Sequence, residues 1–307
     1  MPVRRPIAVL LACASIFVSG SASAYVRTLG GAPGPALFWV DPRATLEVSR
    51  PPDSFPVGLD DFHAAVEGAA ATWSYPALDC TTVALTVAPG FAEDQVVAPD
   101  GHNRVIARTG AWCRDPVNLT NCHDPSQVAV TTVFSRSHPG AWDDGAILEA
   151  DIELNDVAYE WAVIPDAPFS GRDYANAYDL RGALTHEVGH FIGLAHDCML
   201  PAEYVRFDDA GNVSPPCSAV PAYEAPEILG ATMYAFMNAA DVSWRSLSSD
   251  ETRAACSLYS RAGAPVAGWC AVGASPDDPI STTGLFIVTG VLAALVAARR
   301  KRRLRHG

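Results

Sequence analysis

Apolar residues recur at the period of an α-helix in three stretches of the chain. In the first stretch they are three or four positions apart, at Leu59, Phe62, Val66, Ala70 and Trp73. This spacing predicts a helix that ends before Pro76, because proline cannot continue a helix. The same spacing predicts a second helix over about 179–192 and a third over about 249–259.

Shorter stretches show the alternation that is typical of β-strands. It is clearest at 148–154, where apolar residues at 148, 150, 152 and 154 alternate with Glu149, Asp151 and Glu153. We also expect extended segments at 36–40 and 44–48, and strands at 81–87, 103–106 and 127–134. The predicted helices are too few to cover both faces of a parallel sheet, so the pattern favours an α+β domain.

The N-terminal residues have the composition of an export signal. Residues 1–24 begin with Arg4 and Arg5, continue with the apolar run 7–18 and end in small residues. This order is typical of a secretory signal, which we expect to be cut before Tyr25. Two alternatives stay open, a lipoprotein signal that ends at Cys13 and a buried first helix.

The C-terminal residues have the composition of a membrane anchor. Residues 280–298 carry no charge and are followed by a basic cluster at 299–307. A stretch of this length can cross a bilayer as a helix, and the basic residues would stay on the cytoplasmic side. Residues 262–279 form a linker, and together with Cys270 this end resembles the C-terminal sorting tags of myxobacterial surface proteins. We therefore expect an exported domain at 25–261 that stays at the cell envelope or is released.

Charge excludes one class of partner. The chain has 307 residues, and the part between its two ends contains 13 basic and 34 acidic residues. The net charge of this central part is therefore −21. A field of that sign repels phosphate backbones and anionic headgroups, so nucleic-acid binding is excluded.

The cysteines suit an oxidising compartment. Of eight cysteines, Cys13 lies in the predicted signal and Cys270 in the C-terminal segment, which leaves an even number in the domain. Six cysteines allow 15 pairings. Proximity in sequence favours Cys113 with Cys122 and Cys198 with Cys217, which leaves Cys80 with Cys256. Free buried thiols are the alternative.

The chemistry of the chain is concentrated in residues 186–197, which are HEVGHFIGLAHD. His186 and His190 are four positions apart, so on a helix both imidazoles project from one face and can bind one metal ion. Gly193 can end the helix in a left-handed conformation and let the chain deliver His196 as a third ligand. Three imidazoles around Zn²⁺ leave one tetrahedral position for water, which is the arrangement of a catalytic site. Glu187 cannot reach the metal alongside His186, but it can act as a general base on that water.

The spacing HExxHxxGxxH with a downstream methionine turn is that of the metzincin zinc peptidases. The chain resembles their matrixin branch in several segments: residues 147–155 (ILEADIELN), the pair Asp179–Leu180, residues 185–196 (THEVGHFIGLAH), the triplet 232–234 around Met233, and residues 247–259. The resemblance implies a twisted, mixed five-stranded sheet with three helices, a cleft that binds extended peptides, and Met233 as a hydrophobic floor beneath the zinc. It also implies that 147–155 forms the upper edge of the cleft.

Some residues depart from the family pattern. The interval between His196 and Met233 is long and contains Cys198 and Cys217, so a disulfide-bound insertion is expected on one side of the cleft. Ala235 and Met237 stand where matrixins have proline and tyrosine, which leaves the side-chain preference undetermined.

Weaker signals allow two interpretations each. Glu149, Asp151 and Glu153 fit a solvated strand face, and the alternative is a Ca²⁺ site completed by loop carbonyls. Three loop histidines fit ordinary loop residues better than a second metal site: His102, His123 and His138.

The sequence therefore predicts an exported, monomeric zinc endopeptidase that acts on proteins or peptides. His186, His190 and His196 would be the ligands and Glu187 the base. The alternatives are a catalytically silent adhesion or binding module with the same fold, and a structural envelope protein without zinc.

Overall fold

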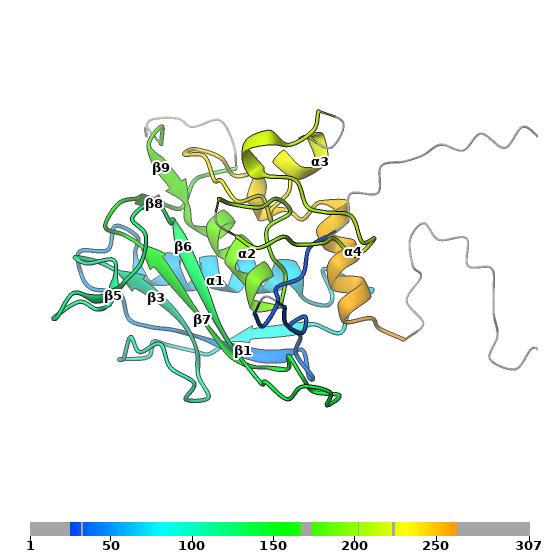
Figure 1. Cartoon of the computed structure of the whole chain (residues 1–307). Coiled ribbons are helices and arrows are strands. Elements are labelled where there is room, and N and C mark those ends of the chain that lie inside the picture. The colour runs from blue at the N-terminus through cyan, green and yellow to red at the C-terminus, as the bar shows by residue number, and fades with distance from the viewer. Residues whose placement is uncertain (1–24, 32, 167–173, 202, 223–224, 263–307) are drawn as a thin grey trace, which may run out of the picture. The chain divides into compact units, whose positions relative to one another are not determined.

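A mixed β-sheet of five strands forms the centre of the computed structural model, which describes residues 25–31, 33–166, 174–201, 203–222 and 225–262 (Figure 1). The strands lie in the order β2 (Ala84–Val87), β1 (Arg43–Val48), β3 (Asn103–Arg108), β7 (Ile147–Asn155) and β6 (Ala129–Ser135). Neighbouring strands are parallel except β6, which runs antiparallel to β7. The predicted α+β class and five-stranded mixed sheet are confirmed.

Two helices cover one face of the sheet. Helix α1 (Leu59–Trp73) and helix α2 (Leu180–Phe191) pack on each other, and their buried side chains join those of the strands in one core. The residues that the helical spacing selected in α1 are buried apart from Leu59, which is exposed, and Ala65 and Ala69 are buried beside them. Helix α1 ends at Trp73, before Pro76, as the sequence predicts.

A third long helix, α4 (Ser249–Leu258), follows the site in sequence. It begins with a capping box in which Ser248 accepts from the backbone N–H of Glu251 and Glu251 accepts from that of Ser248. This exchange satisfies N–H groups that the first turn of a helix leaves without partners. The three long helices match the predicted three.

Several short elements complete the described residues. They are the hairpin β4 (Cys113–Asp115) and β5 (Thr120–Cys122), the pair β8 (Glu160–Ala162) and β9 (Ala177–Asp179), helix α3 (Ala225–Leu229), and the 3₁₀ turns η1 (Cys217–Ala219) and η2 (Ser243–Arg245). The apolar pattern predicts none of them, because each is too short to show a period.

Two expectations about β7 are wrong. The strand does not form the upper edge of the cleft, because it lies inside the sheet between β3 and β6, and residues of β6 line the cleft instead. Its acidic face is not solvated either, since Glu149, Asp151 and Glu153 are each at most 2% exposed. Residues of the loop before β3, of β3 itself and of the β4–β5 hairpin donate to these carboxylates, so the alternation in sequence does not mark a solvent-facing side.

The ends of the chain lie outside the described residues. Contacts divide the chain into Met1–Ala264 and Pro265–Gly307, and the description ends within the first unit. The predicted signal at 1–24, most of the linker, the predicted membrane segment at 280–298 and the basic tail are therefore not described. Within the described part, no helix has both the length and the apolar character to cross a bilayer.

Six cysteines lie in three pairs at disulfide distance. The pairs are Cys80–Cys256, Cys113–Cys122 and Cys198–Cys217, the same pairing that proximity in sequence favours. The first joins the segment before β2 to α4, the second closes the β4–β5 hairpin, and the third closes the insertion after His196.

We predict that peptide mapping of the non-reduced protein will recover these three linkages. We expect the double variant Cys80→Ala/Cys256→Ala to lose about 2–5 kcal/mol of unfolding free energy, because this link closes the longest loop. Urea unfolding measures the loss. Recovery of Cys80 or Cys256 in any other linkage, or as a free thiol, would contradict the pairing.

Candidate metal centre

Helix α2 and the turn that follows it bring the three predicted histidines together. The Asp179 side chain accepts from the backbone N–H of Gly182 and caps the start of α2, which carries His186 and His190 one turn apart. At Gly193 the backbone has a φ of +96°, and a β-carbon there would lie 2.7 Å from the Leu37 carbonyl oxygen. Only glycine suits both the left-handed conformation and this close approach, which let the chain turn back and place His196 opposite the helix.

The three imidazoles present their Nε2 atoms to a common point. Nε2 of His196 lies 3.2 Å from Nε2 of His186 and 3.2 Å from Nε2 of His190. The other ring nitrogens are used elsewhere, since Nδ1 of His186 donates to the Thr232 carbonyl at 2.6 Å and Nδ1 of His190 donates to the Leu194 carbonyl at 2.8 Å. With the proton held on Nδ1, each of these two rings turns a lone pair toward the common point.

Burial favours the neutral, ligating form of these rings. It lowers the pKa of His186 to about 3 and that of His190 to about 4, and it lowers the pKa of His196 well below its ordinary value. A metal ligand must be a neutral imidazole, so the environment selects the state that binds a cation. Among the described residues this triad is the one group of three or more His, Cys, Asp and Glu side chains arranged to hold an ion.

The donor set fits Zn²⁺. Three neutral imidazole nitrogens are the ligands of the catalytic type of zinc site, which keeps a further position open. Nε2 of His196 reaches the same point as the lone pairs of the other two rings, which is an arrangement that can hold a cation. The structure therefore shows a three-histidine site that could bind a metal such as zinc.

Met233 lies against α2 between the two helical ligands. A β-carbon added at Gly189 would meet the Met233 sulfur at 2.2 Å, so the thioether packs directly on the helix backbone. The Met233 N–H donates to the Glu251 carboxylate at 2.6 Å, and the Asp197 N–H donates to the Met233 carbonyl at 3.2 Å. These bonds connect the turn around Met233 both to α4 and to Asp197, the residue after His196.

Glu187 projects toward strand β6. Its Oε2 accepts from the Thr131 hydroxyl at 2.6 Å, and burial raises the pKa of its carboxyl to about 7. A carboxyl with a pKa near neutrality can accept a proton and give it back in the working range of an enzyme. Thr131 carries no motif in the sequence, and only the approach of β6 to α2 reveals it.

A cleft of about 880 Å³ opens over the triad. The three histidines, Glu187 and the start of β6 line it, and so do four residues of the insertion between Cys198 and Cys217, namely Leu200, Pro201, Glu203 and Arg206. The insertion thus borders the cleft, where the sequence placed it. Among the described residues β6 pairs only with β7, so its other edge faces the cleft without a strand partner.

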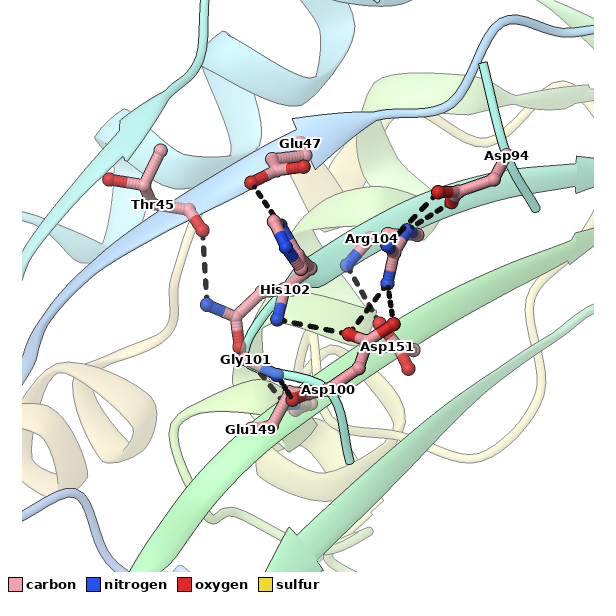
Figure 2. Close-up of polar contacts among 11 residues, drawn as sticks. Thr45, Glu47, Asp94, Asp100, Gly101, His102, Arg104, Glu149 and Asp151 are labelled. Atoms are coloured by element: carbon pink, nitrogen blue, oxygen red, sulfur yellow. Dashed lines mark hydrogen bonds and ion pairs between the residues drawn. The ribbon is translucent and has the colours of Figure 1, made fainter. Parts of the chain in front are cut away.

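The three carboxylates considered for calcium have separate partners. Figure 2 shows Glu149 accepting from the Gly101 N–H and Asp151 accepting from the Arg104 N–H, the latter at 2.8 Å. Glu153 instead accepts from Arg108 and Arg114 at 2.9 and 3.1 Å. These partners are hydrogen-bond donors and not the carbonyl oxygens that Ca²⁺ needs, so calcium at this face stays a prediction.

The loop histidines lie beside carboxylates away from the triad. His102 lies 2.8 Å from Glu47 (Figure 2), His123 lies 3.3 Å from Glu153, and the pair His138–Asp143 is 3.7 Å apart. They form no second group of metal ligands within the described residues.

No protein-family model matches the chain, and no curated protein matches it significantly in sequence. The class that the structure defines is therefore an α+β protein with a three-histidine site that could bind a metal.

We predict that His196→Ala will lose zinc. The wild type should bind about one zinc per chain. Removal of one ligand should weaken binding by more than ~100-fold, because loss of a residue that only orients a ligand can already weaken metal binding by up to about 100-fold. Metal analysis after dialysis and competition with a chelating dye measure this. The matched control, His102→Ala, should keep its zinc, and equal zinc content in both variants would contradict the assignment.

Asp151 gives a pH prediction. Burial raises the pKa of its carboxyl to about 7 in the folded state, above its unfolded value. Its stabilising contribution is therefore full below about pH 4 and is lost as pH rises through 7. Asp151→Asn keeps an oxygen for the Arg104 N–H but cannot ionise, so the variant should gain stability relative to wild type between pH 4 and 7.

The gain should not exceed about 1.4 kcal/mol per pH unit. Urea unfolding at intervals from pH 4 to 8 measures it, with the surface variant Asp53→Asn as control. Parallel pH curves for wild type and Asp151→Asn would show that the carboxyl is not buried in this way.

Proposed function

We propose that the protein is a zinc-dependent endopeptidase. The observation that carries the proposal is the meeting of three Nε2 atoms and the Glu187 carboxyl in one open cleft beside the free edge of β6. A merely structural metal site would be closed and would not need a proton acceptor next to it. The proposal agrees with the metzincin resemblance of residues 179–196 and of the turn around Met233.

The edge of β6 explains how a peptide would be held. Its unpaired N–H and C=O groups can form a ladder with an extended chain, which recognises backbone rather than any one side chain. A peptide that pairs with β6 passes directly over the triad, because Thr131 of β6 contacts Glu187. The substrate class is therefore an extended stretch of protein or peptide.

Zinc held by the three imidazoles would polarise the scissile carbonyl and make water more acidic. Glu187 accepts a proton from the attacking water and passes it to the amide nitrogen as the C–N bond breaks, so the carboxyl returns to its starting state. The Thr131 hydroxyl fixes the orientation of the Glu187 carboxyl through the bond to Oε2. The carbonyls of Thr232 and Leu194 keep two ligand rings in their orientation.

The setting that we propose for this activity is outside the cytoplasm. Three cysteine pairs at disulfide distance agree with an exported domain. The composition of the two ends supports export and attachment to the cell envelope, by a C-terminal membrane helix or a sorting segment. We propose that the protein acts as a monomer on proteins at or beyond the cell surface.

We predict that Glu187→Ala will keep zinc and lose cleavage of an unstructured protein such as casein. The expected fall in kcat/KM is about 10²–10⁴-fold, the usual worth of a positioned general base. Glu93→Ala, a change at a surface ion pair with Arg50, should cleave like wild type. If zinc-loaded wild type and Glu187→Ala are equally inert, the protein is a binding module, and activity that survives removal of zinc would also refute the proposal.

A further inference from the structure

The indole of Trp244 covers one face of the ligand His186. The two rings are stacked, with centroids 4.6 Å apart and planes 14° from parallel. Trp244 is 6% exposed and lines the cleft. The face of His186 that it covers is therefore closed to any side chain of a bound peptide.

Trp244 is fixed in this position from two directions. The next residue, Arg245, bonds both carboxylate oxygens of Asp179, the cap of α2, and also the Ile164 carbonyl. On the helix side, a β-carbon at Gly182 would lie 3.3 Å from the Trp244 β-carbon and 3.3 Å from Met237. Because Gly182 has no side chain, Trp244 and Met237 come close to α2 and fill the space beside the ligand.

The two ends of β6 show which part of a peptide meets Trp244. At the start of β6, Tyr159 donates to the Ser126 carbonyl and packs on Tyr178, which adjoins the Asp179–Arg245 pair. Trp244 therefore lies by the start of the strand.

The N-terminal segment lies by the opposite end of β6. Ser135, at the end of β6, is paired with Ile147, whose N–H donates to the Phe38 carbonyl. The neighbouring Leu37 N–H donates to the Thr28 carbonyl. Thr28 and Trp244 thus line the cleft on opposite sides of Glu187.

The direction of a bound peptide follows from these positions. Strand addition is antiparallel more often than parallel, and a peptide antiparallel to β6 enters by Thr28 and leaves by Trp244. The side chain just after the cleaved bond then points to the wall formed by Trp244. That wall limits the room for a side chain, because the stacked indole occupies the space against one face of His186.

We propose that Trp244 sets the specificity of the site and restricts the residue after the cleaved bond to a small one, such as glycine, alanine or serine. This inference rests on the proposed peptidase function. It assigns a substrate class, peptides with a small residue at that one position, to a cleft that otherwise recognises backbone.

The test is cleavage profiling of the full-length, zinc-loaded protein on a peptide library. Wild type should prefer alanine over phenylalanine after the cleaved bond by about 10–100-fold, the range for a pocket that is one or more methylenes too small. Trp244→Ala should reverse the preference, and Trp244→Phe, which keeps a stacked ring, should be intermediate. The control Trp142→Ala changes an exposed tryptophan outside the cleft and should keep the wild-type profile. A wild-type preference for leucine or phenylalanine, or an unchanged profile in Trp244→Ala, would overturn the proposal.

A binding measurement separates this inference from the peptidase function. Two peptide hydroxamates, identical except for a methyl or a benzyl side chain next to the chelating group, are titrated into zinc-loaded wild type and Trp244→Ala by calorimetry. The methyl compound should bind wild type about tenfold more tightly, and the benzyl compound should gain in Trp244→Ala. This pattern without cleavage would support the role of Trp244 and refute the peptidase function, whereas equal binding of both compounds to wild type would refute the role of Trp244.

Discussion

The site depends on one constraint, which is that three buried imidazoles are held with Nε2 of His196 3.2 Å from Nε2 of His186 and 3.2 Å from Nε2 of His190. Two carbonyl oxygens impose it by fixing the Nδ1 protons of His186 and His190 on the far sides of the rings. Burial then keeps the rings neutral, because an imidazolium inside the domain has lost its hydration. Neutral rings whose Nε2 atoms meet at one point can accept a cation, so the fold provides a site that could hold a metal.

The carbonyl that orients His186 is itself held by the core. Thr232 precedes Met233, and the Met233 N–H is bonded to Glu251 of α4, which also closes the capping box of that helix. One buried carboxylate therefore serves both the start of α4 and the turn under the ligands. Glu251 is fully buried, and these N–H donors compensate for the water that its carboxylate has lost.

The cleft owes its two walls to different kinds of interaction. One wall is the edge of β6, whose backbone groups are left over because the sheet ends there. The other is the segment with Met237 and Trp244, which reaches α2 because Gly182 has no side chain and because Arg245 is bound to Asp179. The first wall would recognise the backbone of a peptide, and the second would exclude large side chains. Because these two functions are independent, the side-chain preference could change without a change of fold.

Much of this protein follows from the sequence alone. The long helices and the strands of the sheet come from local periodicity, and the ligand set comes from the spacing of His186, His190, Gly193 and His196, since a helix followed by a glycine turn leaves few other arrangements. The sequence could not show which side of β7 is covered, because burial of Glu149 and Asp151 depends on donors from Gly101 and Arg104, about 50 residues away in the chain. Nor could it reveal Thr131 or Trp244. Their roles arise from contacts with Glu187 and His186 that exist only once β6 and the segment before α4 have packed against α2. Local spacing thus determined the candidate metal ligands, and tertiary packing alone decided what surrounds them.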